Sequence, residues 1–168
     1  IIVASKAEQA MTSAILRAVS DNKINAAIIT GHGESQISAF TNLLEKNNFE
    51  ITNTSLLTQD IPENSDIAIL AAPLRDLSAD EVKKLSSFLE DNENGSKTLL
   101  FIAAHDQPSM PNLEGFLKEW DITFEEGVVF ETDSNYLIST SPFSPIVNYV
   151  DEEFAKPFIS RQLPVLIP

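Results

Sequence analysis

Short, unbroken apolar runs alternate with amphipathic stretches along most of this chain. The runs at 24–30, 66–72 and 97–104 lack the polar alternation of a half-exposed strand, which indicates strands buried on both faces of a sheet. Residues 49–57 begin with alternating apolar and polar positions and predict another strand. The pattern therefore predicts at least four strands between residues 24 and 104.

Other stretches repeat apolar residues at three- and four-residue steps, which is the spacing of one face of a helix. They predict helices at 7–19, 34–47, 79–89 and 111–120. A serine followed three residues later by a glutamate, Ser78 and Glu81, forms a capping box at the start of the third helix. Helices of this length between buried strands require parallel crossovers.

This order of elements predicts an open three-layer α/β domain, flavodoxin-like or Rossmann-like, with a mostly parallel sheet and helices on both faces. Residues 122–124 and 128–130 look like short strands, and 146–154 resembles a helix. We expect residues 1–168 to form a single domain, with 133–168 as the alternative start of a further segment.

Charge and composition exclude several classes of function. The net charge is -14, so we expect no nucleic-acid partner, because phosphate binding needs clustered Lys and Arg. The chain has no Cys, which excludes disulfides, thiolate nucleophiles and Cys–zinc sites. No apolar run is long enough to cross a bilayer. Because both ends of the chain are apolar, we expect it to be a piece of a longer protein.

The stretch from Thr30 to Glu34 is a candidate ligand-binding turn. It follows a predicted buried strand, at the sheet edge where open α/β folds bind ligands. Gly31 and Gly33 permit backbone conformations and close approaches that other residues resist. The turn lacks the Lys of a phosphate loop and the third Gly of a dinucleotide fingerprint. It is therefore either a ligand site or an architectural bend between strand and helix.

Two histidines follow two predicted strands, and each has an acidic neighbour. His32 and Glu34 follow the strand at 24–30, while His105 and Asp106 follow the strand at 97–104. Carboxyl ends of parallel strands meet at one edge of a sheet, so these four side chains are candidates to converge as N and O ligands of a metal. The simpler interpretation is that they are polar residues at loop edges, where water satisfies them.

Several segments, taken in order, resemble a known family. They are AEQAMTSAI at 7–15, TGHGE at 30–34, IP at 61–62, DIAILAAP at 66–73, DLS at 76–78 with Glu81, PNL at 111–113, WDI at 120–122 and EGVV at 126–129. This set resembles the extracytoplasmic domain of the gliding-motility-type auxiliary proteins of ABC transport systems, a family related to a domain of an intraflagellar transport protein.

The resemblance implies a fold similar to class I glutamine amidotransferases, with no known enzymatic activity and no cofactor. It also implies membrane-spanning segments outside this chain, with the domain on the extracytoplasmic side of the cell membrane. The implied partners are permease or ATPase subunits of an ABC transporter, or a sister auxiliary protein. The chain departs from the amidotransferases because it has no nucleophilic Cys, which argues against their chemistry.

Two readings of function follow. The first is a non-catalytic module that recognises a protein or a substrate in an ABC-type transport system, with Thr30, Gly31, His32, Gly33 and Glu34 as an architectural turn that also offers a binding surface. The alternative is a metal-dependent enzyme, or a binder of small ligands or carbohydrates, that uses His32, Glu34, His105 and Asp106.

Overall fold

A computed structural model describes residues 7–19, 23–90, 97–104, 106–125, 127, 130–137, 142–143, 146 and 156. The chain divides into two compact units, Ile1–Thr123 and Phe124–Pro168. The first unit carries the sheet and the long helices, and the second contains the short 3-10 helix η1, Ser134–Tyr136.

The sheet of the first unit has four parallel strands in the order β2-β1-β3-β4. They are β1 (Ile24–Thr30), β2 (Phe49–Ser55), β3 (Ile67–Ala71) and β4 (Thr98–Ile102). The central strands β1 and β3 consist mainly of Ala and Ile and are buried along most of their length. This strand order confirms the predicted flavodoxin-like α/β fold, and it places the topological switch point between β1 and β3.

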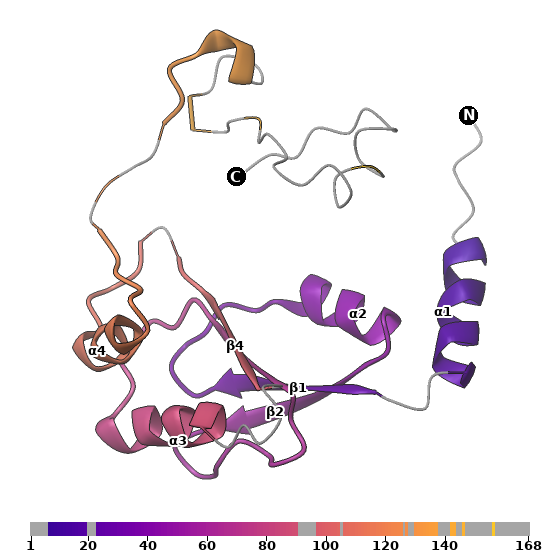
Figure 1. Ribbon diagram of the computed structural model, residues 1–168, viewed down its shortest axis with the longest axis horizontal. Helices are drawn as coiled ribbons and strands as arrows, with labels where there is room; N and C mark the ends of the chain where they lie inside the picture. The colour runs from indigo at the N-terminus through magenta and orange to yellow at the C-terminus, as the bar shows by residue number, and fades with distance from the viewer. Residues whose placement is uncertain are drawn as a thin grey trace. The chain divides into compact units, whose positions relative to one another are not determined.

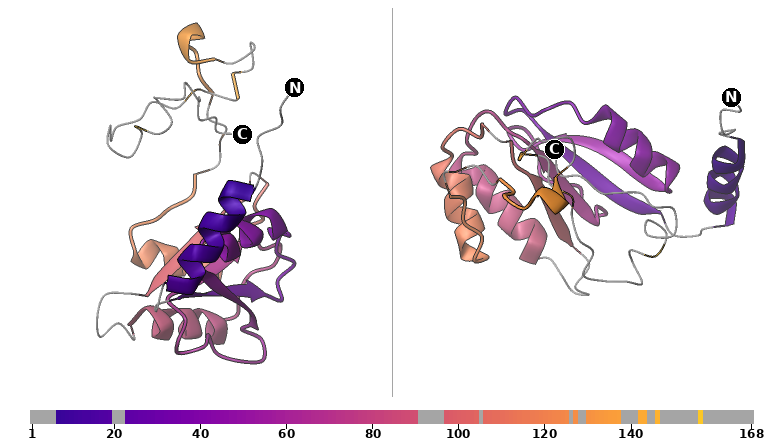
Figure 2. Two further views of the ribbon diagram at one scale, coloured as in Figure 1. Left: turned by 90° about the vertical axis from the view of Figure 1, so that its right-hand side faces the viewer. Right: turned by 90° about the horizontal axis from the view of Figure 1, so that it is seen from above.

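Helices cover both faces of the sheet, as predicted (Figures 1 and 2). On one face, α2 (Ser38–Lys46) packs through Phe40 and Leu44 against Ala26, Ile28 and Ile69. On the other face, α3 (Ala79–Glu90) and α4 (Pro111–Glu119) enclose the larger core. Alternate strand residues point to opposite faces, which is why β1 contributes to both cores. The remaining helix of the first unit is α1 (Ala7–Val19).

The connection from β2 to β3 contains no helix. It crosses from one side of β1 to the other as a loop over 56–66, and it buries Leu56 and Ile61 in the core beneath α3. Parallel crossovers usually carry a helix, and here loop residues lie beside α3 instead.

Some sequence-based boundaries were wrong. The second helix begins at Ser38 rather than Glu34, because the Glu34 carboxylate is bound to the preceding turn. Residues 122–124 do not form a strand, since the amide of Ile122 bonds back to the carbonyl of Leu117 and ends α4. Trp120, at the end of the predicted helix 111–120, is 55% exposed. The predicted strand at 128–130 and helix at 146–154 lie mostly outside the described residues.

The second unit shows local turns in its described part. Asp133 accepts a hydrogen bond from the amide of Asn135 and so caps η1. The amide of Glu131 donates to the carbonyl of Pro142, which closes a loop around η1. Across the described residues of the whole chain, no helix combines the length and the hydrophobicity needed to span a bilayer.

Candidate functional site

The turn after β1 depends on two glycines. Gly31 has φ +120° and Gly33 has φ +77°, which are conformations that side chains with a Cβ resist. A Cβ on Gly31 would lie 3.1 Å from both Leu57 Cδ1 and Ser55 Oγ. A Cβ on Gly33 would lie 3.3 Å from Leu74 Cβ. The positive φ angles and the lack of room for a Cβ therefore both favour glycine at positions 31 and 33. The two glycines of the TGHGE stretch are explained by the geometry of the turn.

Glu34 folds back on this turn and ties it together. One carboxylate oxygen, Oε2, accepts hydrogen bonds from the amides of Gly31 and His32, each at 3.0 Å. The other, Oε1, accepts from the His32 amide at 3.0 Å. Amides of this kind, at the carboxyl end of a strand, are the groups that hold anions in many α/β folds. Here the chain's own carboxylate occupies them.

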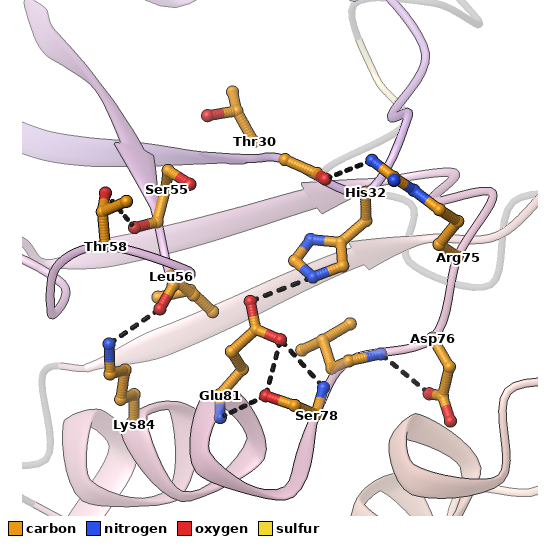
Figure 3. A network of polar contacts seen from close by, with 12 residues as sticks. Thr30, His32, Ser55, Leu56, Thr58, Arg75, Asp76, Ser78, Glu81 and Lys84 are labelled. Carbon is orange, nitrogen blue, oxygen red and sulfur yellow. Dashed lines mark hydrogen bonds and ion pairs between the residues drawn. The ribbon is translucent and has the colours of Figure 1, made fainter.

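Three hydrogen bonds join the turn to the loop that follows β3. The amide of Leu74 donates to the carbonyl of His32 at 2.9 Å, and the amide of Ser35 donates to the carbonyl of Ala71 at 3.0 Å. The Arg75 guanidinium donates to the carbonyl of Gly31 at 2.6 Å (Figure 3). These are the two loops that flank the switch point, where open α/β sheets bind ligands. The bonds bring them into direct contact.

The His32 ring points beneath this junction toward the start of α3 (Figure 3). Its Nδ1 lies 3.2 Å from Glu34 Oε1, and its Nε2 lies 3.0 Å from Glu81 Oε1. The side chains of His32 and Glu81 are 4% and 3% exposed, so this cluster is shielded from water. Each ring nitrogen of His32 therefore faces a different carboxylate.

Glu81 also completes the capping box predicted from the sequence. Its Oε2 accepts hydrogen bonds from the amide and the hydroxyl of Ser78, both at 2.8 Å, and its own amide donates to Ser78 Oγ at 3.4 Å. Burial raises the pKa of Glu81, but the hydrogen bonds from Ser78 and the nearby His32 outweigh burial and hold this pKa below its ordinary value. Glu81 is therefore held as a carboxylate.

One oxygen of Glu81 is incompletely satisfied. Oε1 lies at ion-pair distance from His32 Nε2, but that approach lacks hydrogen-bond alignment, so Oε1 has no hydrogen-bond partner in the described structure. At this 3.0 Å separation His32 contributes an electrostatic attraction to Glu81 that does not depend on the N–H direction. The contact is electrostatic, with the hydrogen bonds of Glu81 supplied by Ser78.

The structure brings together part of the predicted site. Gly31, His32, Gly33 and Glu34 form one turn, in which the His32 side chain is buried. Thr30 precedes it and donates a hydrogen bond to the carbonyl of Thr54 at 3.4 Å.

The other two predicted residues follow β4. Asp106 is exposed and lies outside the buried cluster, while His105 lies outside the described residues. No three His, Asp or Glu side chains of the described chain are placed to hold a metal ion. The reason at His32 is geometric, since its two ring nitrogens face different carboxylates and do not converge with other donors on one point.

Sequence reasoning missed the partner of His32. Glu81 was recognised only as a helix cap, and Arg75 was not singled out. Both lie more than forty positions along the chain from the groups they contact, and no local spacing links them. Comparison of the chain with protein-family models, curated protein sequences and solved structures found no significant match. The structure therefore defines the class of protein at the level of fold, a three-layer α/β domain whose switch-point loops are bonded to each other.

Proposed function

We propose that this chain is a non-catalytic recognition domain of an auxiliary component of an ABC-type transport system. In this proposal it lies on the extracytoplasmic side of the cell membrane, anchored by segments outside this chain. It acts by contacting a permease or ATPase subunit of the transporter, a sister auxiliary protein or a substrate. The ordered resemblance of the chain over about residues 7–150 to such auxiliary proteins is the reason for choosing this system.

The observation that carries the non-catalytic part is the burial of the His32, Glu34 and Glu81 cluster. A general base needs a ring nitrogen within reach of a substrate proton, whereas both ring nitrogens of His32 face internal carboxylates. The Glu34 carboxylate, in turn, is occupied by the turn amides. The chain has no Cys to serve as a nucleophile. These observations support a structural role for the turn. In this proposal, partner recognition takes place on the exposed surface of the domain.

The experiment is affinity purification of the full-length protein from its native membranes after mild crosslinking. We expect permease and ATPase subunits of one ABC transporter to be recovered, identified by mass spectrometry. A tagged membrane protein of similar abundance and orientation serves as the control. Recovery of no transporter subunit above that control would overturn the proposal, as would impermeant labelling of Lys46 only after the cells are broken.

A metal-content measurement on the purified chain separates this proposal from a metal-dependent enzyme. The paired variants are His32→Gln and His105→Gln. Under the recognition proposal neither variant changes the bound metal, and a chelator leaves the thermal midpoint of the wild type unchanged. Stoichiometric metal that is lost in both variants would favour the enzyme instead.

A further inference from the structure

A groove of about 460 Å³ lies on the flank of α3, against the loop that joins β2 to β3. Its apolar wall is formed by Ile61 and Phe88, which are both buried in the core. The groove exists because this crossover lacks a helix, so a loop covers less of α3 than a helix would. Its volume falls within the range of binding pockets, roughly 300–1,000 Å³.

Lysines border this groove. Lys84 donates to the carbonyls of Leu56 at 2.7 Å and Gln59 at 3.2 Å. Lys97 donates to the carbonyls of Glu63 and Ser65, and its ammonium lies 5.2 Å from the centre of the Phe88 ring. These two ammonium groups stabilise the loop by donating hydrogen bonds to its carbonyls. In a crossover helix, such carbonyls would accept from the helix's own amides. The N–H groups of Lys84 and Lys97 are therefore hydrogen-bonded to the loop, but each ammonium keeps its positive charge.

The third lysine that lines the groove, Lys83, does not donate a hydrogen bond to the loop. The Lys83 side chain is exposed and makes no ion pair or hydrogen bond with another residue in the described part of the chain. Ser87 lies one helical turn further along α3 and also lines the groove. Residues four apart on a helix share one face, so an ammonium and a hydroxyl stand beside each other over the apolar wall.

The groove is a local positive region in a negative chain. Three lysines line it with two carboxylates, those of Asp60 and Glu63, whereas the whole chain has a net charge of -14. The Asp60 carboxylate lies 3.5 Å from Lys84 Nζ, on the loop side. Charges separated by more than about 8 Å are largely screened at physiological ionic strength. A ligand in the groove therefore responds mainly to the lysines.

We propose that this groove binds an acidic segment of a partner protein. Carboxylates of the segment pair with Lys83 and accept from Ser87, and an apolar side chain packs on Ile61 and Phe88. A small free anion fits less well, because the donors of Lys84 and Lys97 already serve loop carbonyls. An extended segment uses the positive field along the groove without displacing those bonds. This inference rests on the proposed recognition function and names the surface and the partner chemistry for it.

The test uses the 168-residue chain and a fluorescent peptide of about ten residues in which Glu alternates with Leu. Anisotropy measures affinity, and amide chemical shifts locate the peptide. We expect shifts at Ile61, Lys83 and Ser87, and an affinity that falls with added salt. Lys83→Glu should weaken binding about tenfold. The matched control, Lys118→Glu on the exposed face of α4, should leave binding within about twofold.

Three results would overturn the inference. They are no shifts along the groove, equal effects of Lys83→Glu and Lys118→Glu, and the same shifts with inorganic phosphate alone, which would define a small-anion site. Affinity purification separates this failure from failure of the proposed function. Transporter subunits recovered equally with wild type and Lys83→Glu would refute the groove and keep the function, whereas none recovered with the wild type would refute the function.

Discussion

His32 joins two parts of the domain that are far apart in sequence. Its ring lies between Glu34, from the turn after β1, and Glu81, from the first turn of α3. Two carboxylates buried without a cation between them would repel each other and would lack the water that normally solvates them. His32 therefore stands between two carboxylates and links the turn after β1 to the start of α3.

Replacing His32 by Ala tests this role. We expect the free energy of unfolding to fall by about 3 kcal/mol, because the substitution leaves two buried carboxylates without their partner. Urea unfolding of wild type and variant measures the change. The matched control is Lys118→Ala on an exposed surface, expected within about 0.5 kcal/mol of wild type. Equal, small effects for both variants would show that the cluster contributes little.

The depressed pKa of Glu81 makes stability depend on pH. A carboxyl with a lower pKa in the folded state binds fewer protons there than in the unfolded chain. Its contribution is therefore fully present above the ordinary value of 4.5 and is lost as the pH falls through the folded pKa. Urea unfolding between about pH 7 and pH 3 should show this loss. Glu81→Gln should reduce the acid-dependent part, and an unchanged pH profile in that variant would contradict the assignment.

Gly31 and Gly115 form a matched pair, because only the first has a left-handed backbone. Gly31→Ala should destabilise the domain by about 1–3 kcal/mol, from its φ of +120° and the contact with Leu57. Gly115 lies within α4 with open space around it, so Gly115→Ala should stabilise the domain by about 1 kcal/mol through helix propensity. Thermal or urea unfolding measures both, and effects of the same sign would contradict this account.

At the scale of elements, α4 is capped by a residue far away in the chain. The Asp76 carboxylate accepts hydrogen bonds from the amides of Asn112 and Leu113, at 2.9 and 3.1 Å. It also accepts from the amide of Leu77, at 2.9 Å. A carboxylate at a helix amino end satisfies free amides and favours the helix dipole. Asp76 thus fixes where α4 begins relative to the loop after β3.

Asp76→Ala removes this cap. We expect a loss of about 1–2 kcal/mol and faster hydrogen exchange at Asn112 and Leu113, because those amides lose their acceptor. Asp80→Ala, in the first turn of α3, is the control, since the box of Ser78 and Glu81 remains intact there. Unchanged exchange at α4 in the Asp76 variant would rule out the capping role.

Elements with a strong local pattern were predictable from the sequence. The strand at 24–30 has the predicted bounds, because its apolar stretch Ala26–Ile29 is buried and the Gly31 turn ends the strand. The box of Ser78 and Glu81 set the start of α3 correctly. The start of α2 was predicted four residues early, because the pattern does not reveal that the Glu34 side chain is used by the turn.

At the scale of the whole molecule, negative charge dominates. The chain has a net charge of -14, and two of its ion pairs, Lys23 with Glu50 and Lys84 with Asp60, join side chains of which at least one is well exposed. Exposed pairs contribute little to stability. Repulsion among the carboxylates therefore opposes the compact state more than surface ion pairs support it.

Raising the salt concentration should therefore stabilise the chain. We expect the thermal midpoint to rise between about 10 mM and 200 mM NaCl, as the Debye length shortens and repulsion is screened. Differential scanning calorimetry measures the midpoint. Sucrose at equal osmolality controls for effects other than charge. A midpoint that falls with salt would mean that ion pairs outweigh repulsion.

The sequence by itself determined the α/β class, most of the elements and the glycines of the turn, because burial periodicity, capping and backbone freedom act over a few neighbouring residues. Only the tertiary structure decided that His32 meets Glu81, that Arg75 and Leu74 bond to the turn, and that a crossover without a helix leaves a groove beside Lys83. The physical reason is that these contacts follow from strand order, which brings β1 and β3 side by side across forty residues of chain.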